Sequence, residues 1–253
     1  MIELSKQQGG ICMLWIVLPL IAALGGIIHT ITGFGSGIVM MLFLPSFLDM
    51  ASAPALSSSI NLFLSLILAF KFRKTIRIRM FLLPIIPYLL GSTMAIYALS
   101  GFDMRMVAIS FGVFLIILSL YFTFVAKKMT VTPNWQTAVL CGGISGVTAG
   151  LFGIGGPLMA LYFLAITDSK ESYTGNLQCM FTCTCLCNTI TRISQGYYTL
   201  DLIPLTILGL LAINVGKAVG LKLLDKMDAD LVRKIVYLFV GISGVLKVVQ
   251  NIF

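Results

Sequence analysis

The chain has 253 residues, of which 58% are hydrophobic and only 10% are charged, and its mean hydropathy is +1.03. This composition excludes a water-soluble globular domain and indicates an integral membrane protein. The formal net charge of +8 does not point to a nucleic-acid partner, because the lysines and arginines stand in short segments between apolar runs, where they set membrane orientation.

The first half of the chain contains four apolar segments, at residues 13–48, 54–70, 81–99 and 106–126. The first is interrupted by a glycine-rich break that runs from Gly33 to Gly37. As one continuous helix, residues 13–48 would be about 54 Å long, too long for one crossing of a hydrocarbon core about 30 Å thick and too short for two. We therefore expect a re-entrant hairpin, in which two short helices enter the membrane, turn at the glycines and return to the same side.

The second half repeats this order, with apolar segments at residues 135–167, 173–191, 202–221 and 232–252. Its first segment is broken between Phe152 and Pro157, so that Gly153 matches Gly35 at an offset of 118; farther on, Gly216 matches Gly91 at an offset of 125. The sequence therefore predicts two four-segment repeats within one membrane domain, residues 1–126 and 135–253, joined by a linker at 127–134.

The expected fold class is an all-α, polytopic helical bundle. With hairpins, each repeat makes three full crossings, and an odd number inverts the second repeat relative to the first. The alternative is that each broken segment crosses once and the repeats run parallel. The hairpin arrangement places most of the lysines and arginines on the cytoplasmic side, as the positive-inside rule favours. This cytoplasmic group includes Lys71, Arg73, Lys74, Arg77 and Arg79.

The paired breaks predict a binding site for an anion. Broken helices at corresponding places in two repeats mark the substrate site of many transporters, and a helix that starts inside the membrane presents unpaired N–H groups and a positive dipole end. The chain is thus expected to be a secondary transporter that moves a small anion by alternating access. The expected contacts are Thr32, Gly33, Gly35, Ser36, Gly37, Asn61, Gly153, Gly155, Gly156 and Asn176. The competing interpretation is that the glycines only let helices pack closely.

The glycine-rich break in each half, the four-plus-four organisation and the run from Val215 to Leu224 resemble the TauE/SafE permeases, the sulfite exporter family. The resemblance extends over nearly the whole chain. It implies a secondary transporter in a bacterial or archaeal cell membrane, with sulfite, sulfonates, sulfoacetate and thiosulfate as candidate substrates. The positions that match the family's breaks are Gly33, Gly35, Gly37, Gly153, Gly155 and Gly156.

Ionisable residues inside apolar segments are few. The carboxylates fall in or near loops or at the terminus, so a carboxylate proton relay is not expected. His29, the only histidine, suits proton coupling or contact with an anion, and the alternative is a neutral imidazole bonded to a carbonyl. Lys217 and Arg192 are further candidates for coupling or anion contact. For both, the favoured interpretation is an interfacial side chain that reaches toward water.

Cys179, Cys183 and Cys187 recur every four residues and therefore share one helix face. This face supports an alternative function, a carrier of a soft metal or a thiol compound, although small apolar packing is the favoured interpretation. An enzyme is not expected, because one histidine and no buried acid leave no paired nucleophile and base; no cofactor is expected either. The expected partners are a small anion and the lipid bilayer. A homo-oligomer stays open, because Gly216 and Gly220 can pack within or between protomers.

Overall fold

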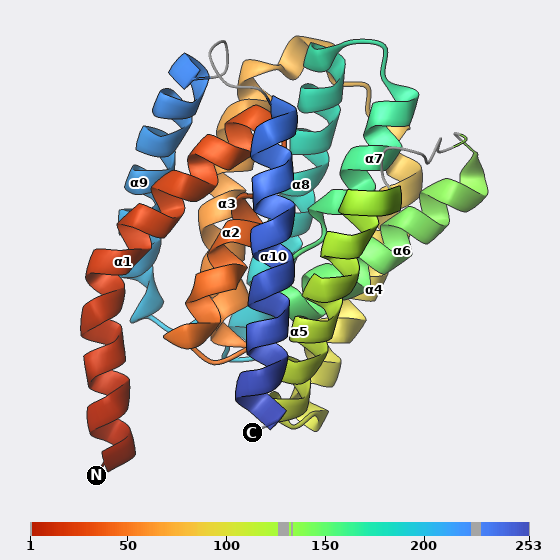
Figure 1. The fold of residues 1–253 in the computed structure, drawn as a ribbon. Coiled ribbons are helices and arrows are strands. Elements are labelled where there is room, and N and C mark those ends of the chain that lie inside the picture. Colours follow the sequence, from red (N-terminus) through yellow and green to blue (C-terminus); the bar gives the residue numbers. More distant parts are fainter. Residues whose placement is uncertain (1, 126–131, 133, 224–228, 253) are drawn as a thin grey trace.

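The computed structural model describes residues 2–125, 132, 134–223 and 229–252, and the secondary-structure elements in these ranges are all helical (Figure 1). The expected linker at 127–134 lies outside the described residues apart from Thr132 and Asn134. The α-helices are α1 (Ile2–Thr32), α2 (Ser36–Phe43), α3 (Ser52–Lys71), α4 (Arg79–Ala98), α5 (Met104–Leu120), α6 (Trp135–Phe152), α7 (Gly156–Ile166), α8 (Lys170–Ser194), α9 (Leu202–Leu223) and α10 (Ala229–Ile252).

Within the described ranges, five helices are long and apolar enough to cross a membrane. They are Met13–Thr32, Ser52–Lys71, Arg79–Gly101, Met104–Phe124 and Leu202–Lys222. Shorter apolar helices lie at Ser36–Ser46, Gly156–Ile166 and Leu238–Ile252. Large apolar side chains such as Ile16, Leu20 and Met94 are mostly exposed on the outside of the bundle, as a lipid-facing surface requires. The prediction of an all-helical membrane protein is therefore confirmed.

The chain leaves helical geometry at both predicted breaks. Helix α1 ends at Thr32 and α2 begins at Ser36, and α6 ends at Phe152 and α7 begins at Gly156. Gly35, with φ of 112°, and Gly153, with φ of 69°, adopt positive φ values that side chains with a Cβ atom disfavour. These residues turn the chain within the bundle, which is why glycine occupies them.

The helices associate mainly as the pairs α1–α9, α4–α6, α3–α8 and α5–α10. Glycines bring several of these backbones together. A Cβ atom on Gly216 of α9 would collide with the carbonyl of Ala23 in α1, and one on Gly220 would lie 3.1 Å from the Cα atom of Ile27. Gly146 of α6 meets the backbone of Tyr88 in α4 in the same way. Gly216 and Gly220 therefore pack within this chain, where the sequence had left packing between protomers open.

Candidate functional site

The two helix breaks, far apart in the sequence, contact each other in the fold. A Cβ atom on Gly37 would lie 3.3 Å from the carbonyl oxygen of Gly153, and one on Gly156 would lie 3.4 Å from the Cβ atom of Phe34. The N-termini of α2 and α7 therefore meet near the centre of the molecule. This contact defines where the predicted site lies.

A small cavity of about 70 Å³ lies at this meeting point; we call it the inner cavity. Residues of both breaks line it, and they include the N-terminal end of α2. The Val39 N–H bonds the Gly35 carbonyl, and the N–H groups before it belong to the first turn, which has no intrahelical acceptors. The inner cavity is lined by His29, Phe34, Gly35, Ser36, Gly37, Ile38, Ser58, Asn61, Ser65, Tyr88, Ala149, Gly153, Ile154, Gly155, Gly156, Pro157, Phe181, Cys185 and Asn188. None of these lining residues carries a carboxylate.

A chain of buried hydrogen bonds runs along the inner cavity. The Ser36 hydroxyl donates to Oδ1 of Asn61, whose Nδ2 donates to the Ser57 carbonyl. His29 Nδ1 lies 2.8 Å from the Ser36 hydroxyl, and Gln178 Nε2 lies 3.0 Å from His29 Nε2. Because Ser36 gives its proton to Asn61, it accepts from His29 Nδ1–H, and Gln178 donates to the other ring nitrogen. The contacts thus describe a neutral imidazole.

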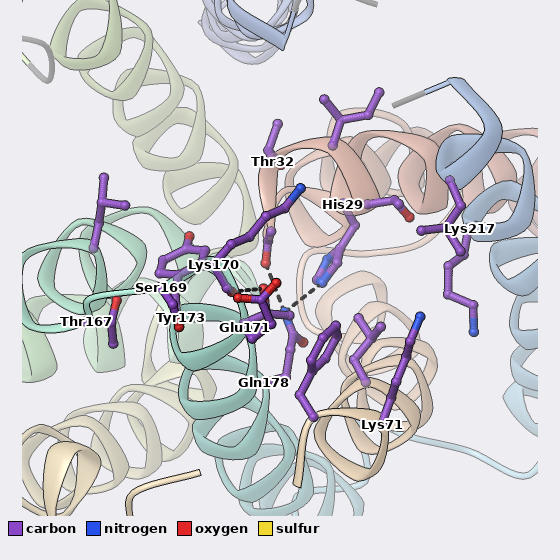
Figure 2. Close-up of a pocket in the computed structure, with 18 of the residues that line it drawn as sticks. His29, Thr32, Lys71, Thr167, Ser169, Lys170, Glu171, Tyr173, Gln178 and Lys217 are labelled. Atoms are coloured by element: carbon purple, nitrogen blue, oxygen red, sulfur yellow. Dashed lines mark hydrogen bonds between the residues drawn. The ribbon is translucent and has the colours of Figure 1, made fainter. Parts of the chain in front are cut away.

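A second and larger cavity of about 920 Å³, which we call the vestibule, borders the inner cavity. His29 lines both cavities, and Figure 2 shows it beside Gln178, with Lys71 and Lys217 on the other side of the vestibule from Tyr173. Gln178 also donates to the Gly33 carbonyl at 2.9 Å. His29 and Gln178 therefore form the partition between the vestibule and the inner cavity.

Arg192 corrects one interpretation from the sequence. Its side chain is 0% exposed and does not lie at the membrane surface. The guanidinium donates to the carbonyls of Ala149 at 3.3 Å and Gly150 at 2.5 Å, in the last turn of α6, and to Ala51 at 3.3 Å, just before α3. The interfacial interpretation failed because α8 continues to Ser194 and packs this end against the other helices.

Lys217 was a candidate for anion contact or for an interfacial side chain. It lines the vestibule, and its Nζ atom donates to Oδ1 of Asn214, one turn earlier on α9, at 2.8 Å. The ammonium group is therefore held at the vestibule wall and does not reach the inner cavity. Thr32 also lines the vestibule, and its hydroxyl donates to the Ile28 carbonyl at 2.9 Å.

Asn176 lies apart from both cavities. Its Oδ1 atom accepts from the Arg77 N–H at 2.7 Å, and its Nδ2 atom donates to the carbonyls of Ser172 and Thr75. It therefore tethers α8 to the segment between α3 and α4. Gln178, two positions farther along α8, lies beside His29, although the sequence had indicated Asn176 as the contact from this segment. We therefore leave Asn176 out of the site.

The remaining predicted glycines differ in their surroundings. Gly33, with φ of 83°, lines the vestibule. Gly155 lines the inner cavity, but a Cβ atom there would collide with the Tyr88 hydroxyl and lie 2.8 Å from the Ala149 Cβ atom. Gly155 therefore both lines the cavity and packs closely against its neighbours. A substitution there would affect folding as well as binding.

The cysteines of α8 differ in their surroundings. Cys183 is exposed, while Cys179 and Cys187 are partly buried, and Cys187 lies 3.9 Å from the Thr93 hydroxyl. Among the residues that the structure describes, no group of three or more histidine, cysteine, aspartate or glutamate side chains is close enough to hold a metal ion. Cys185, which points away from that face, lines the inner cavity.

An all-helical membrane protein whose two helix breaks meet at a small polar cavity has the form of a membrane permease. The sequence model of the family described as sulfite exporter TauE/SafE matches residues 18–246. The chain therefore belongs to the TauE/SafE family of transmembrane transport proteins. No curated protein and no solved structure matches the chain.

Proposed function

We propose that this protein is a secondary transporter that carries a small sulfur-containing anion through the inner cavity by alternating access. The observation that carries the proposal is the meeting of the N-termini of α2 and α7 beside the chain of polar contacts from Gln178 to Asn61. Membership of the sulfite exporter family makes sulfite, thiosulfate, sulfonates and sulfoacetate the candidate substrates.

The chemistry of the inner cavity suits an oxyanion. Each helix N-terminus contributes roughly half an elementary positive charge, and hydrogen bonds to a charged group contribute about 1.5–3 kcal/mol each. Gly37 leaves the backbone of α2 accessible, and the Ser36 hydroxyl is able to rotate from Asn61 toward a bound oxygen. With no carboxylate in the wall, a substrate anion meets no like charge from the lining side chains.

Contacts at one end of the bundle support a re-entrant α1–α2 pair. Pro45, just after α2, accepts from Lys247 near the end of α10, and the first turn of α5 bonds the last residues of α10 through Arg105. Figure 1 places the N- and C-terminal ends at the same end of the molecule. In the proposed arrangement, α1 and α2 therefore enter and leave on one side.

Helix pairing supports the relation between the repeats. If α1 corresponds to α6, and α4 to α9, the pair α1–α9 is the counterpart of α6–α4, while α3–α8 and α5–α10 are their own counterparts. A pseudo-twofold axis generates this pattern. We assign the vestibule, with Lys71 and Lys170 in its lining, to the cytoplasmic side on the positive-inside rule, so that the structure represents a state open to the cytoplasm.

The test is transport by the purified protein in liposomes, measured as uptake of labelled sulfite, thiosulfate, sulfoacetate and taurine. Ser36→Ala removes the hydroxyl between His29 and Asn61, and we expect at least a tenfold fall in kcat/KM, about 1.4 kcal/mol. Ser59→Ala is the matched control, because Ser59 is also buried but bonds only the Ala55 carbonyl and does not line the inner cavity.

A thermal-shift assay gives an independent readout of binding. A ligand at a hundred times its Kd stabilises a protein by about 2.7 kcal/mol, so the transported anion should raise Tm for the parent chain and for Ser59→Ala, and less for Ser36→Ala. Equal kcat/KM and equal stabilisation in both serine variants would place the substrate elsewhere and refute the proposed site.

A further inference from the structure

A fully buried arginine, Arg192, lies beyond the inner cavity at the end opposite the vestibule. We propose that Arg192 is the latch of a closed gate at this end and that Lys71 is its counterpart at the vestibule, so that the two cations alternate in sealing the pathway. The inference rests on the alternating-access function proposed above. It assigns the mechanism of closure to particular side chains.

The course of α8 locates Arg192 relative to the inner cavity. Helix α8 begins at the vestibule with Lys170, passes Gln178 at the partition, and then lines the inner cavity with Phe181, Cys185 and Asn188. Arg192 follows Asn188 by four residues, one helical turn farther on. It therefore lies just beyond the inner cavity, on the side away from the vestibule.

The contacts of Arg192 join three helices. From α8, it reaches the carbonyls of Ala149 and Gly150, which end α6 immediately before the second break, and the carbonyl of Ala51, which precedes α3. Ala149 also lines the inner cavity. One side chain thus holds α3, α6 and α8 together directly behind the site, as a closed gate requires.

This cluster retains unmet hydrogen-bonding capacity. The Nε atom of Arg192 and the Oδ1 atom of Asn188 have no hydrogen-bond partner, and both residues are at least nine-tenths buried. The hydrogen-bond partners of the guanidinium are neutral carbonyls, and buried charges normally require a paired charge. Arg192 therefore has a donor left for an anion when the carbonyls separate.

The vestibule is lined by the residues of the other repeat that correspond to the backbone partners of Arg192. At the offset of 118 that relates the two breaks, Ala149, Gly150 and Ala51 correspond to Ile31, Thr32 and Ser169, all of which line the vestibule. At the same offset Arg192 itself corresponds to Lys74, which does not line the vestibule. Lys71, three residues earlier, does line it, and it stands in the last turn of α3 as Arg192 stands in the last turn of α8, so we take Lys71 as the counterpart by its place on the helix. The vestibule end therefore presents the same set of positions as the closed end, in an open arrangement.

The correspondence between the two ends predicts the second conformation of the transporter, in which the vestibule is closed and the opposite end is open. When the far gate opens, Arg192 leaves the carbonyls of α6 and α3 and faces the pathway, where its charge attracts the anion. At the vestibule, Lys71 then approaches the carbonyls of Ile31 and Thr32 at the end of α1. The two gates exchange roles without any titration of a carboxylate.

The experiment measures access to each gate separately. In a chain whose six native cysteines are replaced by alanine, Ala51→Cys reports on the closed gate and Ser169→Cys on the vestibule; Ala51 contributes to the latch only through its carbonyl, which the substitution keeps. A membrane-impermeant thiol reagent is applied to right-side-out and inside-out vesicles. With Arg192 intact, the cysteine at 169 should react rapidly from the vestibule side and the cysteine at 51 slowly from either side.

Arg192→Met should accelerate labelling at position 51 at least tenfold and slow it severalfold at position 169. Lys71→Met should shift both rates in the opposite direction, and unchanged rates would remove Lys71 from the gate. Arg192→Lys keeps the charge with a single donor group and should give an intermediate rate, which keeps the test available if the methionine variant does not fold. Arg105→Met is the matched control, because Arg105 also bonds two backbone carbonyls but joins α5 to α10.

Unchanged labelling at position 51 in folded Arg192→Met or Arg192→Lys would overturn the latch. Anion-induced stabilisation, measured on the same samples, separates this failure from failure of the proposed function. If the anion still stabilises these variants while labelling is unchanged, the transport proposal stands and the latch does not. If no anion stabilises the parent chain, the transport proposal itself fails.

Discussion

Gln178 connects the two halves of the chain at a single side chain. It is 0% exposed, and its Nε2 atom contacts both His29 and the Gly33 carbonyl, at 3.0 and 2.9 Å. Both partners belong to the first half, while Gln178 belongs to the second. The amide therefore holds His29 and the first break in fixed positions relative to α8.

Gln178→Leu preserves much of the side-chain volume and removes both contacts. Each net hydrogen bond contributes about 1 kcal/mol, so we expect the free energy of unfolding to fall by about 1–3 kcal/mol and the KM for the anion to rise. Thermal unfolding in detergent and liposome uptake measure the two effects. Gln178→Glu keeps an acceptor but adds a negative charge at the partition, and should reduce uptake more than Gln178→Leu; the reverse order would contradict the assigned role.

Individual residues differ in how far the sequence could predict them. Ser36 and Asn61 follow from the glycine break and from the polar interruption of the next apolar segment, and the structure brings them together with His29. The sequence indicated Asn176 where the structure has Gln178 beside His29. Two positions along a helix point in nearly opposite directions, and the packing of α8 decides which of them faces the cavities. The interfacial interpretation of Arg192 failed because α8 continues to Ser194, three residues beyond the predicted end at Thr191, and this end of the helix is packed inside the fold, where Arg192 is 0% exposed.

At the scale of helices, glycine positions control how closely α1 approaches α9 and α4 approaches α6. Gly216 has no space for a Cβ atom, because the Ala23 backbone occupies it, whereas a Cβ atom on Gly143 of α6 would meet nothing within 4 Å. Both glycines lie within helices. They therefore form a matched pair in which only the surroundings differ.

We expect Gly216→Ala to destabilise the protein by about 1–3 kcal/mol, since the overpacked helices must separate. Gly143→Ala should be neutral or stabilise it by up to about 1 kcal/mol through helix propensity. Unfolding of both variants in detergent, followed by circular dichroism, compares the two values. Equal losses would show that the glycines contribute through backbone flexibility and not through close contact.

At the scale of the whole molecule, the relation between the repeats decides which side the chain ends face. The inverted arrangement that we propose puts both ends on the outside and the segment of Lys71 to Arg79 in the cytoplasm, whereas parallel repeats put both ends in the cytoplasm. Most of the apolar segments could be predicted from hydropathy, and within the described ranges five helices are long and apolar enough to cross a membrane. The sequence also predicted that both breaks contribute to one site, but not which of their residues touch, because those contacts join parts of the chain that are far apart in the sequence.

Reporter fusions at the C-terminus distinguish the two arrangements. Alkaline phosphatase is active only outside the cytoplasm, and green fluorescent protein does not become fluorescent after export in unfolded form through the general secretory route. We expect an active phosphatase fusion and a dark fluorescent-protein fusion. A bright fluorescent fusion with inactive phosphatase would place the C-terminus in the cytoplasm and refute the proposed inverted arrangement with both ends outside.

Both helix breaks contribute glycines to the wall of the inner cavity, namely Gly35, Gly37, Gly153 and Gly156, and this affects how such a permease can evolve. Backbone N–H groups cannot be exchanged by point mutation, so the anion-binding capacity that we propose would be inherited with the fold. Divergence in substrate preference is then confined to the few side chains that enter the cavity, among them Ser58, Tyr88 and Asn188. Relatives with different substrates should accordingly share their glycines and differ at these positions.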